Sequence, residues 1–481
     1  MSQKQEIQKF DSSALNGIRG ISAIHIVLFH TFHYCTFDFN LYGQVHMPLF
    51  FLLSGFCMTL GYGKTKYDGY EVCCGSCTKV SRGCCGCETG AEAEEKIFNT
   101  HNYLIGRCTR ILPIYWICYL FGLPLIWAGH SYIKYEDSED LGTLIGFLLV
   151  PLLLIQTWIG MLAGSGPDGP SWTVSTLFFF YFNYPWTLLF CQRRSNKALT
   201  IIMGLSFLIE CALGVALVLV PVNGYWWSTA WPISRFPVFL MGVCAGVLCQ
   251  RMQSGDEDAV DRIGRCSDKN AILSFIEDLL IPMPWVKSTK VSKEQKEKSW
   301  ARRVDINSFF YFAVLLNLAG VNIYYTLKDW IWDEEIYYYN KYKNETKPGD
   351  VEFFKDGTFG WLGQLVFVQI QLMMIVGLCL DGGRSLFSKF YKTWVMQFLG
   401  RISMSLYLVH EPIIYYINWC YFGSVEWVKN DDGQFVKPSN VRMPTYFVPV
   451  HVGISLVAGI FLTLCIEEPA RKFLTKKLRK S

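Results

Sequence analysis

Long apolar runs recur along the whole chain, and they constrain its fold more than any other feature. The chain has 481 residues, of which 51% are hydrophobic and 17% are charged. The charges gather in a few loops, and the apolar runs between them have roughly 17 to 25 residues, enough to cross a hydrocarbon core about 30 Å thick. We therefore expect an all-α integral membrane protein with a single membrane domain over residues 1–481. Nucleic-acid binding is not supported, because the basic residues are not gathered on a soluble domain.

Apolar segments and positive charges together predict the topology. The apolar segments are residues 14–34, 46–62, 104–127, 141–160, 171–190, 199–220, 233–250, 306–326, 361–380, 395–417 and 444–466. Most Lys and Arg lie in the N-terminal stretch and in residues 64–110, 191–198, 251–305, 381–394 and 471–481. Because basic loops favour the cytosolic side, we expect these stretches and both termini in the cytosol. The acidic loop 327–360 is expected on the lumenal or extracellular side, where the sequon at Asn344 is a candidate for glycosylation.

One apolar segment does not fit this topology. Two cytosolic termini require an even number of crossings, whereas the apolar segments number eleven. Residues 141–160 contain Pro151 and lead into the sequence GSGPDGP, so we expect this segment to be re-entrant or to lie against the bundle. Non-helical backbone at membrane depth is tolerated only beside protein or a water-filled cavity. The prediction is a bundle of about ten transmembrane helices with a cavity near this segment.

The loop 251–305 has an amphipathic part and a basic part. It contains the stretch AILSFIEDLLIPMPW followed by KVSKEQKEKSWARR. This pattern is typical of an interfacial helix bound to anionic membrane lipids. A solvated basic linker is the alternative.

The loop 64–103 is rich in cysteine. Cys74-x2-Cys77 and Cys84-x2-Cys87 have the spacing of two metal-binding knuckles, which predicts a structural zinc site. Palmitoylation near the membrane and an unmodified insertion are the alternatives. Stable disulfides are not expected in a cytosolic loop.

Ionisable residues inside apolar segments are the first candidates for chemistry. His30 lies within the first segment, and His410 and Glu411 lie within the segment 395–417. Such residues are costly in lipid and indicate functional sites, although a neutral histidine bonded to a neighbouring helix is the alternative. An imidazole with a reference pKa of about 6.5 can take the proton of an attacking hydroxyl. We therefore expect His30 to be the catalytic base, with His410 as its rival.

Arginines mark the cytosolic starts of two segments. Arg107 and Arg110 are three residues apart and share one face of the helix that they begin. A helix start favours anions, and each guanidinium can hold phosphate oxygens bidentately. The pair therefore predicts a phosphate clamp, with simple anchoring to lipid headgroups as the alternative. Arg19 begins the first segment.

In their order along nearly the whole chain, these motifs resemble the acyltransferase-3 family of membrane O-acyltransferases. The matching elements are Arg19-Gly20 with His30, FFLLSGF at 50–56, Arg107-x-x-Arg110-Ile-x-Pro113-x-Tyr115, Trp172, Arg235-x-x-x-Phe239-x-x-Gly242, Tyr407-Leu408-x-His410 and Glu467-x-Pro469. The resemblance implies transfer of an acyl group, often acetyl, from cytosolic acyl-CoA to a hydroxyl group, commonly of a carbohydrate. It places His30 in the catalytic position, and Arg107 and Arg110, together with Arg19, in the donor site. The residues expected to bind the acceptor are Trp172, Arg235 and Glu411.

Three positions depart from the family pattern. Asn16 and Val238 stand where acidic residues are common, and Leu177 stands where the motif opened by Trp172 usually carries Glu. These departures leave open which acceptor is used. The Cys-rich loop and the sequon indicate a eukaryotic branch of the family.

The function predicted from these features is O-acylation at a membrane. The expected partners are membrane lipids and a small-molecule or glycan acceptor, in an endomembrane or the plasma membrane. A lipid or solute transporter is the alternative from another class, although the sequence shows no convincing internal repeat of the kind common in transporters. An inactive relative is a third possibility.

Overall fold

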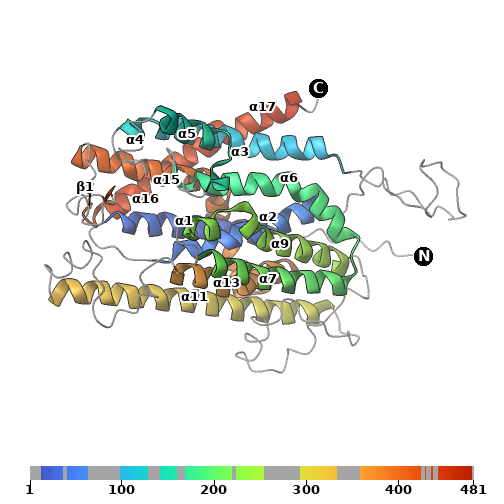
Figure 1. Cartoon of the computed structure of the whole chain (residues 1–481). Coiled ribbons are helices and arrows are strands. Elements are labelled where there is room, and N and C mark those ends of the chain that lie inside the picture. Colours follow the sequence, from blue (N-terminus) through green and yellow to red (C-terminus); the bar gives the residue numbers. More distant parts are fainter. Residues whose placement is uncertain are drawn as a thin grey trace, which may run out of the picture.

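Long helices that run side by side make up nearly all of the described structure (Figure 1). The computed structural model describes residues 12–35, 41–62, 98–127, 141–159, 168–218, 224–253, 293–332, 358–423, 428–429, 435–436 and 443–478. The only strands in these ranges are β1 (Val428–Lys429) and β2 (Phe435–Val436), which form one short antiparallel pair. The predicted all-α class is therefore confirmed.

The α-helices follow the predicted segments closely. They are α1 (Ser13–His33), α2 (His46–Tyr62), α3 (Thr100–Gly122), α4 (Pro124–Trp127), α5 (Leu141–Leu152), α6 (Trp172–Gln192), α7 (Asn196–Val218), α8 (Gly224–Thr229), α9 (Pro232–Gln253), α11 (Lys293–Trp332), α13 (Thr358–Leu380), α14 (Leu386–Tyr391), α15 (Trp394–Phe422), α16 (Phe447–Phe461) and α17 (Glu468–Leu478). Short 3-10 turns are η1 (Gly43–Val45), η4 (Gln156–Trp158) and η6 (Gly169–Ser171). A π-helical turn, η9 (Leu462–Glu467), joins α16 to α17.

Several helices have the length and composition of membrane spans. Five stretches among the described residues qualify: Gly43–Tyr62, Thr100–Gly122, Asn196–Leu213, Trp227–Met252 and Phe447–Leu478. The outer surface of the bundle exposes large apolar side chains such as Trp186, Phe309 and Leu316, which suit a hydrocarbon environment. These features identify a multi-pass membrane protein, as the apolar runs predict.

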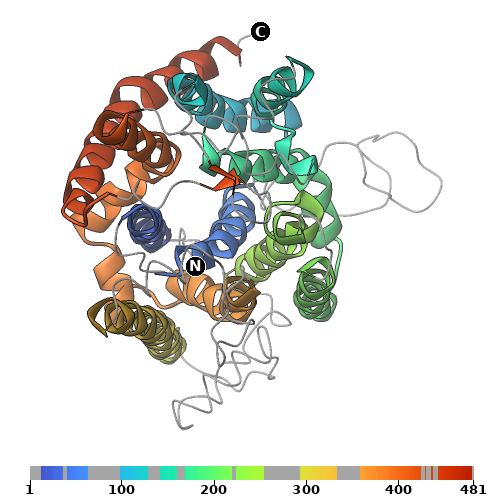
Figure 2. The same cartoon turned by 60° about the vertical axis from the view of Figure 1, so that its left-hand side comes forward.

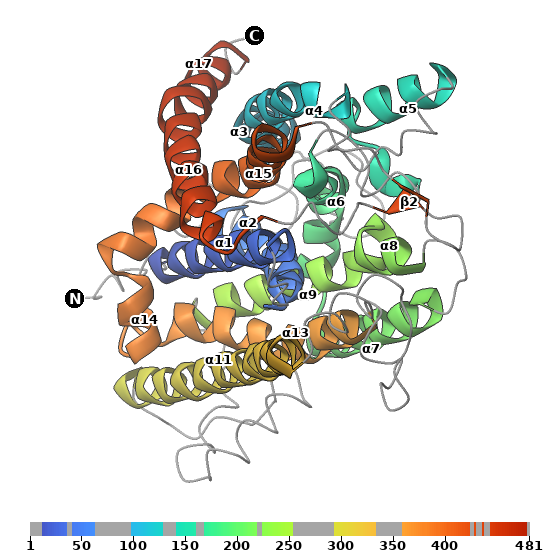
Figure 3. The same ribbon diagram turned by 90° about the vertical axis from the view of Figure 1, so that its left-hand side faces the viewer.

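Helices α1 and α2 occupy the inside of the bundle, with the other helices around them (Figures 2 and 3). Glycines allow their close contacts. A Cβ on Gly20 of α1 would lie 2.5 Å from the backbone nitrogen of Gly400 on α15, and a Cβ on Gly55 of α2 would meet the carbonyl oxygen of Phe239 on α9. Glycine in the Arg19-Gly20 motif is thus explained by packing.

The departure from the family pattern at Asn16 also has a packing reason. The amide nitrogen of Asn16 donates to the backbone oxygen of Gln397 over 3.1 Å. A carboxylate at this position has no hydrogen to donate. Asn16 therefore ties the start of α1 to the start of α15.

The segment 141–160 does not form one continuous helix. Helix α5 ends at Leu152, a length of about 18 Å, and Leu154 has a left-handed backbone with a φ of 61°. Tyr115 and Tyr119 donate to the carbonyl oxygens of Pro151 and Leu148 over 2.5 and 2.6 Å. Protein groups thus satisfy part of this backbone, and the expectation that the segment is re-entrant or lies against the bundle stays a prediction.

Several predicted loop boundaries were wrong. Helices α3 and α13 begin at Thr100 and Thr358, inside the loops expected at 64–103 and 327–360. The largest difference is at α11. Helix α11 begins at Lys293 and ends at Trp332, so residues 293–305 and 327–332, expected in loops, are helical. The cause is a sequence of good helix formers that also makes contacts, including an ion pair of 3.0 Å between Glu294 and Lys298. The amphipathic stretch of loop 251–305, the cysteines of loop 64–103 and Asn344 lie outside the described residues.

Contacts gather the positively charged stretches at one end of the bundle, which we call the basic end. There the side chain of Gln397 at the start of α15 donates to the carbonyl oxygen of Ser13 at the start of α1, over 2.8 Å. Arg401 pairs with Glu468 at the start of α17 over 2.7 Å. We call the other end, where Tyr34 bonds to Met443, the opposite end.

Candidate functional site

A channel runs from the basic end into the bundle. It has a volume of about 250 Å³ and is lined from α1, α2, α3, α6 and α15. Along α2 the lining extends from Met58 to Met47, roughly 16 Å of helix. A cavity of this volume and length is narrow, which suits a ligand with an extended chain.

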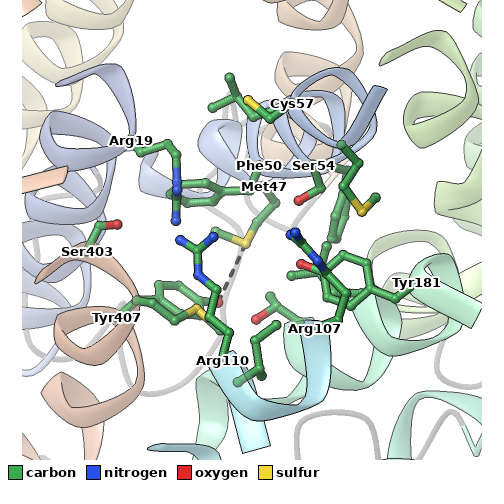
Figure 4. Close-up of a pocket in the computed structure, with 17 residues that line it drawn as sticks. Arg19, Met47, Phe50, Ser54, Cys57, Arg107, Arg110, Tyr181, Ser403 and Tyr407 are labelled. Atoms are coloured by element: carbon green, nitrogen blue, oxygen red, sulfur yellow. Dashed lines mark hydrogen bonds between the residues drawn. The ribbon is translucent and has the colours of Figure 1, made fainter. Parts of the chain in front are cut away.

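Three arginines converge on this channel. Arg19 comes from α1, and Arg107 and Arg110 come from α3. Figure 4 shows the three side chains pointing toward one another across the cavity. The family resemblance places all three arginines in the donor site, and in the fold all three line this one channel.

Aromatic side chains hold Arg107. Its guanidinium carbon lies 5.7 Å from the ring centroid of Tyr62 and 5.8 Å from that of Tyr103. One terminal nitrogen donates to the Tyr62 hydroxyl over 3.5 Å, whereas the buried Nε has no hydrogen-bond partner in the part of the chain that the structure describes. Cation–π contacts therefore orient the group and leave hydrogen-bonding capacity for a ligand.

The charge of this arginine cluster is only partly balanced. Arg110 is repelled by Arg19 and Arg107 and attracted by Glu467. Glu467 lies on the π-helical turn η9 and accepts a hydrogen bond of 3.0 Å from Ser405. No other carboxylate of a described residue attracts Arg110. Three cations beside one carboxylate favour an anionic ligand.

The rest of the channel wall is mainly apolar. Phe50, Leu53 and Met58 line it from α2, and Leu177 lines it from α6. Leu177 replaces the Glu of the family pattern, so this chain has an apolar wall at that point. Val238, the other replacement on the outer helices, is fully buried in the core.

The deep end of the channel lies beside the candidate histidines. Tyr407 lines the channel, and its hydroxyl lies 3.6 Å from the sulfur of Met47 (Figure 4). The ring centroid of His410 is 5.9 Å from that of Tyr407, and the ring centroid of His30 is 5.1 Å from that of His410. The fold therefore brings His30 and His410 together, close to the end of the channel.

The two histidines differ in surroundings. His410 is fully buried, its Nδ1 lies 2.7 Å from the carbonyl oxygen of Tyr407, and its Nε2 has no hydrogen-bond partner in the described residues. Because a carbonyl accepts only, Nδ1 carries the hydrogen and Nε2 is the free acceptor. His30 is half-buried and has no hydrogen bond with any described residue. Both rings can therefore accept a proton.

A third histidine, His451 on α16, was missed by the sequence reasoning. It is fully buried; its Nδ1 lies 2.7 Å from the hydroxyl oxygen of Thr31, and its Nε2 lies 2.8 Å from the carbonyl oxygen of His410. His451 thus links Thr31, the residue after His30, to the backbone of His410. Its presence in the apolar segment 444–466 is the signal that could have identified it.

Two other histidines have separate contacts. His25 lies with Nδ1 at 2.7 Å from Nε2 of His46, and Nδ1 of His46 lies 3.0 Å from the hydroxyl of Tyr311. This network joins α1, α2 and α11. His33 is exposed at the end of α1.

The predicted acceptor residues fall in different places. Glu411 is buried next to His410 and accepts a hydrogen bond of 2.7 Å from Tyr415. Trp172 is at the start of α6, next to Thr173 of the channel wall. Arg235 does not line the channel: it is fully buried and pairs with Glu210 over 2.6 Å. Its contacts are those of a residue that joins α9 to α7.

Asp168 was also missed. It precedes η6 and is 1% exposed, and neither carboxylate oxygen has a hydrogen-bond partner among the residues that the structure describes. The sequence GSGPDGP by itself predicts only a stretch that breaks a helix. The unpaired burial of its aspartate is a property of the packed bundle.

The described residues contain no group of His, Cys, Asp or Glu arranged to hold a metal ion. Cys74, Cys77, Cys84 and Cys87 lie outside the described residues, so the zinc prediction stays a prediction.

Comparison with known proteins gives one match. The sequence model of the Acyl_transf_3 family, described as an acyltransferase domain, matches residues 12–253, which is half of the chain. The matched range includes α1, α2, α3, α6 and α9, and with them all three arginines of the channel. No curated protein and no solved structure matches.

Proposed function

The chain belongs to the acyltransferase-3 family and is an acyltransferase, and on this premise we propose that it transfers an acyl group from cytosolic acyl-CoA to a hydroxyl group of an acceptor at the lumenal or extracellular side. The observation that carries this proposal is the channel. Three arginines lie at one end of it, and its other end lies beside His30 and His410.

The arginines suit the phosphates of coenzyme A. Arg107 and Arg110 on one helix face, with Arg19 opposite, can hold the 3′-phosphate or the pyrophosphate through charge-assisted hydrogen bonds. The nucleotide stays near the basic end, which we place in the cytosol. The pantetheine arm then extends along the roughly 16 Å of channel toward Met47 and Tyr407.

The histidines suit proton transfer at the thioester. As the acceptor hydroxyl attacks the thioester carbon, its proton passes to the ring of His30, and the new carbon–oxygen bond forms. The carbon–sulfur bond then breaks, and the sulfur takes the proton from the imidazolium, so that free coenzyme A leaves as a thiol. His410, with its unpaired Nε2, is the alternative base.

The topology gives each substrate its own route. We propose about ten crossings with both termini in the cytosol, so that the donor comes from the basic end and the acceptor from the opposite end. The acyl group is acetyl or another short acyl group, and the acceptor is a carbohydrate or another alcohol. Neither the donor nor the acceptor has to cross the membrane completely.

The test compares two histidine variants of the purified protein in nanodiscs. We expect His30→Ala to bind acetyl-CoA normally and to lose transfer by about 10²- to 10⁴-fold, the contribution of a general base. Binding and transfer are measured separately, because only a chemical role affects one without the other. If His30→Ala retains full transfer while His410→Ala does not, the base is His410, and if both retain it, general-base catalysis by this pair is refuted.

Natural acceptors are sought by mass spectrometry. Metabolites and glycans of cells with and without the protein are compared for species that carry one additional acyl group. The proposal requires such species to become less abundant when Arg110→Ala replaces the native chain.

A further inference from the structure

The buried carboxylate of Asp168 lies behind the deep end of the channel. Its environment includes the hydroxyl groups of Tyr115 and Tyr407 and the thiol of Cys118, which are all neutral. Among the residues that the structure describes, the one charged group that interacts with it is Glu411, of the same sign. Burying a carboxylate without a cation or a hydrogen-bond donor is strongly unfavourable. A ligand that supplies the missing positive charge would offset this cost.

Glu411 lies on the other side of the same turn. It is 2% exposed and accepts hydrogen bonds from Tyr415 over 2.7 Å and from Tyr34 over 3.5 Å. A Cβ on Gly169, the residue after Asp168, would collide with Oε2 of Glu411. Glycine at this position therefore lets the η6 turn close on Glu411 and brings both carboxylates to one site.

Buried polar side-chain atoms without a hydrogen-bond partner among the described residues lie on both sides of this site. Within the described part of the chain, Nε2 of His410 has no hydrogen-bond partner, and two helical turns beyond Glu411 both amide atoms of the fully buried Asn418 have none. Buried polar atoms are normally satisfied, so such a row indicates a ligand or water path. The row connects the reacting histidines to the opposite end, where we place the acceptor.

The geometry points to an acceptor that carries a positive charge: we propose that Asp168 and Glu411 bind the ammonium group of an amino alcohol while its hydroxyl faces His30 and His410. A neutral polyol would offer hydrogen-bond donors, but it would leave Asp168 without a counter-charge among the described residues and Glu411 with His33 alone. The rings of Tyr34, Tyr407 and Tyr415 near the carboxylates further favour a cation. The identity of the hydroxyl as acyl acceptor rests on the proposed function, whereas cation binding does not.

The test uses two probes of the same shape, choline and its uncharged analogue 3,3-dimethyl-1-butanol. The purified full-length protein in nanodiscs is titrated with each probe, and binding is measured by equilibrium dialysis. We expect choline to bind at least about tenfold more tightly than the neutral analogue. Asp168→Asn and Glu411→Gln, which keep the shape and remove one charge, should each abolish most of this preference.

A second readout separates ligand binding from a structural role. Without ligand, Asp168→Asn should melt at a higher temperature than the native protein, because the variant removes an unpaired buried charge. Glu210→Gln is the matched control: this equally buried carboxylate has its partner in Arg235, so the change should lower the melting temperature and leave the choline preference intact.

Three results would overturn the inference: no binding of choline, equal binding of both probes, or an unchanged preference in Asp168→Asn and Glu411→Gln. Acetyl transfer to choline is measured separately. Charge-selective binding without any transfer to any alcohol would refute the proposed function and keep the cation site. Transfer to neutral alcohols, with no preference for charged ones, would support the proposed function and refute the cation site.

Discussion

Arg110 offers the sharpest test of the donor site. It lines the channel and forms no hydrogen bond with any residue that the structure describes, and its strongest interaction is repulsion by Arg19. Arg110→Ala therefore breaks no internal hydrogen bond and relieves repulsion, so the melting temperature should not fall. Arg107→Ala is less clean, because it also removes the contacts with Tyr62 and Tyr103.

The expected loss in donor affinity follows from the chemistry of the contact. A hydrogen bond to a charged group contributes about 1.5 to 3 kcal/mol, and every 1.4 kcal/mol is about tenfold in affinity. Arg110→Ala should therefore weaken acyl-CoA binding by roughly 10- to 150-fold. Arg110→Lys keeps the charge but loses the planar fork, so it should recover only part of this loss.

The assay is equilibrium binding of coenzyme A and of 3′-dephospho-coenzyme A to the protein in nanodiscs. If the arginines hold the 3′-phosphate, native protein prefers coenzyme A and Arg110→Ala loses the preference. If they hold the pyrophosphate, both ligands weaken equally. Arg401→Ala is the control, since Arg401 also lies near the basic end but pairs with Glu468 outside the channel. Unchanged binding of both ligands in Arg110→Ala would refute the donor site.

Three further predictions test the topology and the packing. Impermeant maleimide applied to intact cells should leave the cysteines from Cys73 to Cys87 unlabelled. Labelling of these cysteines from outside would refute the proposed orientation. Arg235→Met should destabilise the protein by about 3 to 5 kcal/mol because Glu210 is left unpaired, and adding Glu210→Met should restore most of the melting temperature; a loss of donor or acceptor affinity in the folded double variant would instead return Arg235 to the site. His451→Ala should lower the rate of transfer by about 10²-fold through misplacement of His30 and His410 while the KM for acyl-CoA stays constant, and a changed KM with an unchanged kcat would contradict the positioning role.

The sequence determined the class of the protein and the location of its helices. Apolar runs long enough for a bilayer leave the backbone no other way to satisfy its hydrogen bonds than helices, so the predicted segments 14–34 and 46–62 coincide almost residue for residue with α1 and α2. Helical periodicity also placed Arg107 and Arg110 on one face. These conclusions depend only on residues within one or two helical turns of each other, and the sequence gives the order of those residues directly.

The tertiary structure decided which distant residues meet. The sequence offered Arg235 as a ligand, and the fold pairs it with Glu210 on another helix. Conversely, Asp168 and His451 belong to no recognised motif. The fold buries Asp168 without a hydrogen-bond partner among the described residues, and it connects His451 to Thr31, next to His30, and to the carbonyl oxygen of His410. The role of a charged or polar side chain depends on which groups neutralise it or bond to it. In this bundle those groups lie on other helices, from 25 residues away for Arg235 and Glu210 to 420 residues away for Thr31 and His451, so the pairs are fixed only when the helices pack.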